Sequence, residues 1–204
     1  MCNEISRKTA LDDLLREFEI LSPPPRFEWE GGATPNDLAG KASVRIRDTS
    51  PVFRLNGGTL VGSMIPWAWP GPKGAPVFNF RSEGRDFAHS DRVLIFADGF
   101  YEYTAPAAPK VKLKDQHYFT RAAGGWFWIA GLVKDGCFSL LTTQPGSDVA
   151  PYHDRQIVTL PPQAGLDWLT LARPQGELLR AEPAGTFRVE TLRRDGVVLA
   201  EDLF

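Results

Sequence analysis

The residue with the most distinctive chemistry is Cys2, which directly follows Met1. An initiator methionine is normally removed when the second residue is small, and the mature chain would then carry an α-amine and a thiol on one residue. Their reference pKa values are about 8 and about 8.5, so a fraction of both groups is reactive near neutral pH. Such a residue condenses with an aldehyde to an imine and then a thiazolidine ring, or its thiolate attacks an amide carbonyl. The alternative is an incidental terminal cysteine without a role.

Two further side chains have the chemistry of proton transfer. Glu102 lies in an aromatic segment, 99–103, and a carboxyl group among aromatic rings tends to have a raised pKa. His153 stands just before an expected strand at 156–160, and histidine exchanges protons near neutral pH. The alternatives are an outward-facing strand carboxylate and a solvated loop histidine.

Polar and aromatic side chains in the middle of the chain are suited to nucleic acid. Asn79 and Arg81 lie two positions apart on an expected strand and therefore share a face, where an amide and a guanidinium would contact phosphates or bases. Glu83 continues that face, so an ion pair with Arg81 is the structural alternative. Trp67 and Trp69 lie in a Pro- and Gly-rich segment and, if exposed, would stack single-stranded bases; otherwise they are core residues.

The charges are unevenly distributed. The net charge is −2, yet residues 41–121 hold 12 basic and 7 acidic side chains, whereas 1–40 hold 4 and 8 and 167–204 hold 5 and 7. A nearly neutral protein with such a local excess can present one cationic groove to a phosphate backbone. The alternative is a mixed, solvated surface.

The pattern of apolar residues and turns predicts a β-rich α+β fold in a single domain, residues 1–204. The chain is 43% hydrophobic, and its 17 Pro and 19 Gly residues interrupt regular structure often. We expect helices at 6–20, 165–171 and 175–181, and a loop at 26–42. We expect strands at 44–46, 52–55, 59–65, 77–80, 93–97, 100–104, 116–121, 127–133, 138–143, 156–160 and 187–192.

Several classes of protein are disfavoured. The sequence has no run of about 18 apolar residues, so no membrane span is expected. Residues 1–20 are charged and lack the apolar stretch of a signal peptide, so a cytoplasmic location is expected. The protein is expected to be a monomer. Two cysteines are too few for a disulfide framework, and Cys137 is interpreted as a buried strand residue without a role. The three histidines and two cysteines have no metal-ligand spacing, so neither a metal nor another cofactor is expected.

Seven short segments, taken in order, carry a more specific signal. They are Met1-Cys2-Asn3, Met64-Ile65-Pro66-Trp67, Asn79-Phe80-Arg81-Ser82-Glu83, Asp98-Gly99-Phe100-Tyr101-Glu102, Ala130-Gly131-Leu132, Thr142-Thr143 and His153-Asp154-Arg155. Together they resemble the SOS response-associated peptidase family, or SRAP domain, from residue 1 to about 195. The resemblance implies an α+β domain with a curved, mostly antiparallel, barrel-like β core, short flanking helices and a cationic DNA groove.

The resemblance also implies an activity, which is covalent capture of abasic sites in single-stranded DNA and removal of the protein's own initiator Met. Cys2 would form a thiazolidine crosslink with the ring-opened sugar. Glu102 would be the general acid and base, Asn79 would orient the sugar, and His153 would assist proton transfer and hold the sugar or its phosphate. The DNA contacts would come from Arg81, Trp67, Trp69 and Thr143.

The chain departs from the family pattern at two places. Many members have Gly-Arg after the cysteine, where this chain has Asn3-Glu4, and the Trp of the family's Trp-Gly-Leu-Ile-Pro is absent from 62–66. These changes concern DNA affinity more than chemistry. Two alternatives stay open: a single-stranded DNA-binding module without catalysis, and an N-terminal-cysteine amidohydrolase that acts on a small amide.

Overall fold

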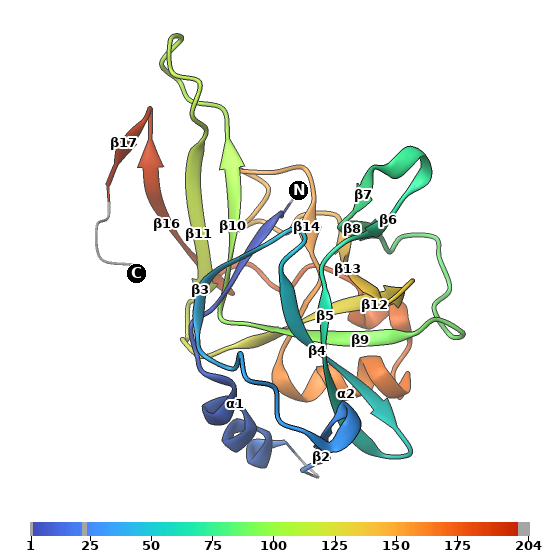
Figure 1. Cartoon of the computed structure of the whole chain (residues 1–204). Coiled ribbons are helices and arrows are strands. Elements are labelled where there is room, and N and C mark those ends of the chain that lie inside the picture. The colour runs from blue at the N-terminus through green and yellow to red at the C-terminus, as the bar shows by residue number, and fades with distance from the viewer. Residues whose placement is uncertain (1, 22–23, 200–204) are drawn as a thin grey trace.

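Two curved, mostly antiparallel sheets form the core of the protein. The computed structural model describes residues 2–21 and 24–199. The first sheet has the order β17 (Val197–Val198), β16 (Phe187–Arg194), β11 (Asp115–Arg121), β10 (Gly99–Thr104), β1 (Glu4–Arg7) and β3 (Lys41–Arg45). Figure 1 shows β10 and β11 standing upright, whereas β9 (Arg92–Ala97) and β12 (Phe127–Lys134) of the other sheet run across below them.

The second sheet is larger and carries helices on its outer face. Its order is β14 (Gln156–Ile157), β13 (Cys137–Thr143), β12 (Phe127–Lys134), β9 (Arg92–Ala97), β4 (Thr49–Asn56), β5 (Thr59–Pro66) and β2 (Arg26–Trp29). Two short strands pair alongside: β15 (Thr159–Leu160) with β12, and β8 (Asn79–Arg81), in parallel, with β13. β6 (Trp69–Pro70) and β7 (Pro76–Val77) form a separate hairpin, and the helices are α1 (Leu11–Glu17), α2 (Pro162–Thr170) and α3 (Gln175–Leu178).

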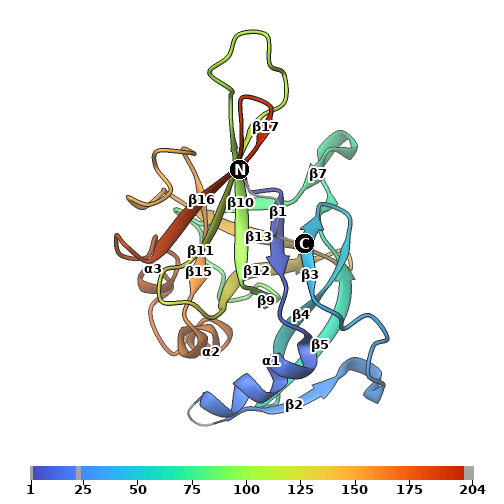
Figure 2. The same cartoon turned by 90° about the vertical axis from the view of Figure 1, so that its left-hand side faces the viewer.

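Apolar side chains fill both faces of the second sheet. Between the sheets, Ile5 and Phe100 of the first meet Ile95 and Phe127 of the second, and all four are fully buried. On the other face a second cluster, which includes Trp128, lies under α1 and α2. Figure 2 shows both helices below the crossing strands. The expected curved α+β fold with short helices is therefore confirmed, and no described helix is long and apolar enough to cross a membrane.

The start of the chain differs from the expected helix at 6–20. Residues 4–7 form β1, which lies between β10 and β3, and the helix begins only at Leu11. Ile5 pairs with Phe100 on one side and Val44 on the other, and its side chain is fully buried. Pairing with two strands distant in sequence thus overrides the local helical pattern. This pairing fixes where Cys2 and Asn3 lie.

Most other elements match the sequence-based predictions. The Asn56-Gly57-Gly58 turn joins β4 and β5, and both glycines have positive φ angles, 54° and 83°. The predicted loop at 26–42 was wrong at its ends, because it contains β2 and the first residues of β3. The predicted strand at 156–160 is split into β14 and β15, because its two halves pair with different neighbours.

Candidate active site

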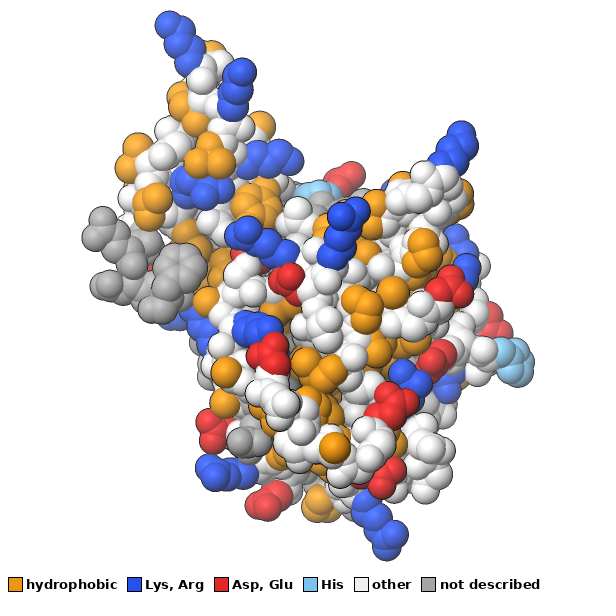
Figure 3. All heavy atoms as spheres, viewed as in Figure 1, with side chains coloured by type: hydrophobic (Ala, Val, Ile, Leu, Met, Phe, Trp, Pro, Cys, Tyr) orange, Lys and Arg blue, Asp and Glu red, His pale blue; other side chains and the backbone are white. Residues whose placement is uncertain are grey.

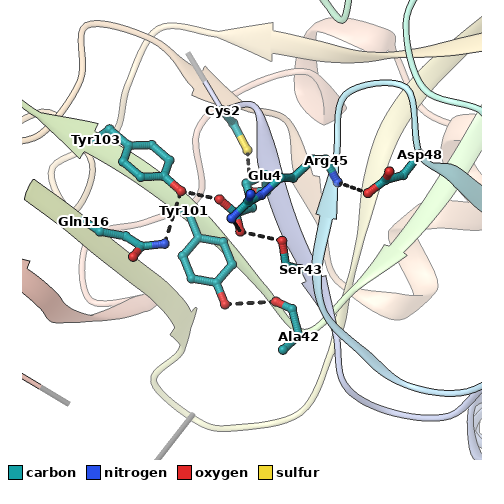
Figure 4. Close-up of polar contacts among 9 residues, drawn as sticks. All are labelled: Cys2, Glu4, Ala42, Ser43, Arg45, Asp48, Tyr101, Tyr103 and Gln116. Carbon is teal, nitrogen blue, oxygen red and sulfur yellow. Dashed lines mark hydrogen bonds and ion pairs between the residues drawn. The ribbon is translucent and has the colours of Figure 1, made fainter. Parts of the chain in front are cut away.

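Cys2 lies immediately before β1 and is almost fully buried. Its exposed fraction is 1%, and its thiol donates a hydrogen bond to the backbone oxygen of Glu4 at 3.3 Å, as Figure 4 shows. Burial raises the pKa of the Cys2 thiol well above its ordinary value, and the charge of Glu102 raises it further. At neutral pH the thiol therefore keeps its proton. Met1, whose removal is expected from the sequence, lies outside the described residues.

Asn79 holds the backbone of Cys2 in place. Its side-chain nitrogen donates a hydrogen bond of 2.7 Å to the Cys2 carbonyl oxygen. Asn79 begins β8, which is positioned by its parallel pairing with Leu140 of β13. The side-chain oxygen of Asn79 is buried and accepts no hydrogen bond from the described residues.

Glu102 lies in the middle of β10, and its carboxyl group is buried, with 1% of the residue exposed. The alternative of an outward-facing strand carboxylate is thereby wrong. Burial is the main cause that raises the pKa of Glu102 to about 7; Asp154 raises it further, and a backbone hydrogen bond from Cys2 lowers it. A carboxyl group with this pKa is both a proton donor and an acceptor at neutral pH.

His153 lies in the loop between β13 and β14, with its side chain 21% exposed. Its Nδ1 accepts a hydrogen bond of 3.0 Å from the backbone N–H of Arg155 and lies 2.9 Å from a carboxylate oxygen of Asp154. The contact with Asp154 needs a protonated Nδ1, whereas the hydrogen bond from Arg155 needs an unprotonated Nδ1. Burial lowers the pKa of His153, which favours the neutral ring with its proton on Nε2.

A pocket of about 450 Å³ brings the proton-transfer groups together. Its lining residues are Asn3, Glu102, Tyr103, Lys112, Leu113, Lys114, His153 and Arg193. Glu102 and His153 therefore face the same space, and Asn3 places the backbone next to Cys2 at its wall. The basic side chains of Lys112, Lys114 and Arg193 line the same pocket, whereas Cys2 is not among its lining residues.

Arg155 is a site residue whose role the sequence did not reveal. Its guanidinium is buried and forms a two-pronged ion pair with Glu83, at 2.5 and 2.8 Å, and a hydrogen bond to Thr142. The alternative that Glu83 pairs with Arg81 is therefore wrong, and Arg81 is exposed on β8. Because the Arg155 backbone also contacts His153, this ion pair holds the histidine loop in place.

The aromatic and hydroxyl groups expected at the DNA lie inside the protein. Trp67 is fully buried, stacks on Phe138 and donates a hydrogen bond to the Phe78 carbonyl. Trp69 is 6% exposed and Thr143 is 5% exposed. The expectation that the two tryptophans are exposed for base stacking is wrong, because both rings complete the core beside β8 and β13. Cys137, expected to be buried, is only half-buried.

Glu4, the acidic residue beside the nucleophile, lies in a buried hydrogen-bond network. Its carboxylate accepts hydrogen bonds from Ser43 at 2.6 Å, from Arg45 at 3.1 Å and from the hydroxyl of Tyr103 (Figure 4). The Tyr103 hydroxyl also accepts a hydrogen bond from Gln116. The network ties β1 to both neighbouring strands, and Arg45 offsets the negative charge near Cys2.

No group of three or more His, Cys, Asp and Glu side chains within residues 2–21 and 24–199 is arranged to hold a metal ion. The acid–base groups of the pocket are Glu102 and His153. The arrangement is suited to reactions in which a cysteine residue attacks a carbonyl group and a carboxyl group transfers the protons.

Comparisons with known proteins give evidence on the family that is independent of the geometry of the site. The family model described as "SOS response associated peptidase (SRAP)" matches residues 60–194. The abasic site processing protein YoaM of Bacillus subtilis (strain 168) is 27% identical over 183 residues, which cover 83% of this chain and 79% of that protein.

Solved structures share the fold. A phage-related protein from Bordetella bronchiseptica has a TM-score of 0.70 and 24% identity, with 95% of each chain covered. A protein from Bacteroides thetaiotaomicron has a TM-score of 0.65 and 14% identity, with 95% of this chain and 93% of the other covered. At these identities the likeness concerns the fold alone.

Proposed function

The chain belongs to the SOS response-associated peptidase (SRAP) family, and we propose that it captures abasic sites in single-stranded DNA as a thiazolidine crosslink to Cys2. Family membership and the likeness to YoaM support a role in DNA damage. The observation that carries the proposal is the pairing of Cys2 with Glu102, whose buried carboxyl group has a pKa of about 7 and faces a pocket rimmed by basic side chains.

The reaction needs the α-amine of Cys2, so Met1 must first be removed. We propose that the protein itself or an aminopeptidase hydrolyses that peptide bond. The free amine is the first nucleophile, because it reacts as a neutral amine with a reference pKa of about 8. The thiol, which burial keeps protonated, reacts second.

The crosslink would then form in three steps: ring opening, imine formation and ring closure. An abasic sugar is mostly a closed hemiacetal, and Glu102 protonates the ring oxygen while a water molecule takes the proton of the anomeric hydroxyl, which gives the open aldehyde. The Cys2 amine adds to the aldehyde carbon, and one water molecule leaves to give an imine. The Cys2 sulfur adds to the imine carbon, and its proton passes to the nitrogen, which closes the five-membered ring.

Other residues would position the reactants. His153, with its proton on Nε2, would donate a hydrogen bond to a sugar or phosphate oxygen. Asn79 holds the Cys2 carbonyl, and its free side-chain oxygen would accept a hydrogen bond from the sugar. Arg81, exposed at the end of β8, would contact a phosphate.

The test is a crosslinking assay with single-stranded DNA that holds one abasic site. We expect a species that survives heating in denaturing buffer, that is absent in Cys2→Ala and that persists in Cys137→Ala, the matched change at the chain's other cysteine. Reversible binding without this species would contradict the proposal and favour a binding module. Hydrolysis of small amides without DNA binding would favour an amidohydrolase.

A further inference from the structure

The connection between β10 and β11, residues 105–114, projects from the protein beside the pocket. We call this segment the arm; Figures 1 and 2 show it rising from the ends of the two strands. Lys112, Leu113 and Lys114 follow one another on the arm, and all three side chains are exposed. Figure 3 shows Lys and Arg side chains on the arm and on the surface below it.

The same three residues line the pocket that contains Glu102 and His153. Leu113 also lines an adjoining depression of about 490 Å³, between the pocket and β3. The arm therefore forms one wall of the candidate active site. A strand that places a sugar in the pocket can lie along this wall.

Specific contacts hold the arm in place. The backbone N–H of Ala108 donates a hydrogen bond of 2.8 Å to Asp195, whose own N–H donates one of 2.7 Å to Asp115. Arg193 donates a hydrogen bond of 2.9 Å to the Lys114 carbonyl. Pro106 and Pro109 restrict the backbone further. Because the arm is anchored, a ligand that binds it has less conformational entropy to remove.

The pocket wall is positively charged, although the whole chain has a net charge of −2. Three cationic side chains line the pocket: Lys112, Lys114 and Arg193. The acidic group that faces them is Glu102, which is partly protonated at neutral pH because its pKa is about 7. The local charge is complementary to phosphates.

Leu113 adds an apolar contact between the two lysines. The exposed large hydrophobic side chains of the described residues are Leu113, Val197, Val198 and Leu199, and of these Leu113 lines the pocket. Its exposed fraction is 54%. Trp67 and Trp69 are buried, so neither offers a ring to a base at this surface.

We propose that the arm is a second DNA-binding surface, beside the reacting residues. Lys112, Lys114 and Arg193 hold the phosphates next to the pocket, and Leu113 packs against the neighbouring base. A single strand fits this surface, because its bases are free to meet an apolar side chain while its phosphates meet cations. The position of the reacting sugar rests on the proposed function, whereas strand binding by the arm does not.

Binding of an intact oligothymidine, without an abasic site, tests the arm directly. Fluorescence anisotropy of the labelled strand is measured over a series of salt concentrations. For Lys112→Ala/Lys114→Ala we expect weaker binding and a salt dependence whose log–log slope is smaller by about 1.4, since each phosphate contact on a single strand contributes about 0.7. Lys134→Ala, an exposed lysine on the β12–β13 turn, is the control and keeps the wild-type slope.

Variants of Leu113 test the apolar contact separately from the cationic ones. Leu113→Ala raises the dissociation constant about fivefold with the salt slope unchanged, because an apolar contact releases no counterions. Leu113→Trp tightens binding, because an indole stacks on any base. The side chain is exposed, so both variants keep the wild-type melting temperature.

Two results would overturn the inference: wild-type protein that does not bind the intact strand, or arm variants that bind it no differently from Lys134→Ala. Crosslinking to abasic DNA is measured separately on the same proteins. Wild-type protein that binds the intact strand through the arm but forms no crosslink would contradict the proposed function and support the arm. Equal crosslinking by wild-type protein and arm variants, without binding of the intact strand, would contradict the role of the arm and support the proposed function.

Discussion

The side-chain nitrogen of Asn79 lies 2.7 Å from the backbone oxygen of Cys2, a residue 77 positions earlier in the chain. The bond joins β8, which pairs with the larger sheet, to the residue that precedes β1 of the smaller one. The position of Cys2 is thus set from two sides: by the pairing of β1 with β10 and β3, and by an amide from the opposite sheet.

Loss of this bond should affect chemistry more than stability. Asn79→Ala removes one hydrogen bond at a half-buried position, so we expect the free energy of unfolding to fall by only about 1 kcal/mol. The crosslinking rate should fall by about tenfold or more, because Cys2 loses its orientation. Single-turnover crosslinking and urea unfolding measure the two effects. A rate that fell only in proportion to the unfolded fraction would assign Asn79 a structural role alone.

Glu102 should determine the pH dependence of crosslinking. Ring opening needs the protonated carboxyl group, so the rate should fall as the pH rises above about 7. At lower pH the amine is protonated and the rate falls again, which gives a bell-shaped profile. Glu102→Gln should lower the rate by about 10²–10⁴ and change the alkaline limb. An unchanged alkaline limb in Glu102→Gln would assign that limb to another group.

The same carboxyl group should make stability depend on pH. Its pKa is raised from 4.5 when unfolded to about 7 when folded, so between these values the folded chain binds more protons. The free energy of unfolding should therefore decrease as the pH rises through this window, by up to about 3 kcal/mol. In Glu102→Gln this decrease should be absent, whereas Glu28→Gln, at an exposed position, should keep it. Urea unfolding at several pH values gives both profiles, and parallel profiles for wild type and Glu102→Gln would refute the assignment.

The thiol and the amine of Cys2 should act at separable steps. Cys2→Ser keeps the amine and replaces the second nucleophile, so the imine should form without ring closure. We expect little heat-stable crosslink with Cys2→Ser unless borohydride is added to reduce the imine. A gel with and without borohydride distinguishes the two products. A heat-stable, borohydride-independent crosslink in Cys2→Ser would show that the thiol is not needed.

Two tyrosines of β10 allow a hydrogen bond to a carboxylate to be compared with one to a backbone carbonyl. Tyr103→Phe removes a bond to the buried carboxylate of Glu4 and should cost about 1.5–3 kcal/mol, whereas Tyr101→Phe removes a bond to the Ala42 carbonyl and should cost about 1 kcal/mol. Arg45→Ala should cost less than about 1 kcal/mol, because the Arg45 side chain is 67% exposed. Equal losses for the two tyrosine variants, measured by urea unfolding, would contradict this expected difference.

The hairpins were predictable because their turns have a local chemical signature. Asn56-Gly57-Gly58 and Asp135-Gly136 contain residues that tolerate positive φ, and the strands on either side follow directly. β1 was not predictable in this way, because its pairing partners lie about 40 and 95 positions away and its local pattern favours a helix.

The site has the same two kinds of feature: those that local sequence predicts and those that depend on how the sheets pack. Residue types and motif order predict Cys2, Asn79, Glu102 and His153 as site residues. In the structure Asn79 contacts Cys2, Cys2 interacts with Glu102, and Glu102 shares a pocket with His153. The burial of the tryptophans and the partner of Glu83 depend on how the sheets pack, and no local pattern encodes it. The position of Glu4 was visible in the sequence, but its neutralisation by Arg45 depends on the pairing of β1 with β3.

The burial of Cys2 has a consequence for its survival in the cell. Oxidants such as peroxides attack the thiolate, and so do the disulfides of small thiols. Cys2 is 1% exposed as a residue and the pKa of its thiol is raised, so it presents neither the accessible surface nor the charge that these reagents require. If Cys2 reacts with abasic sites as proposed, its burial keeps the thiol reduced until such a site is bound.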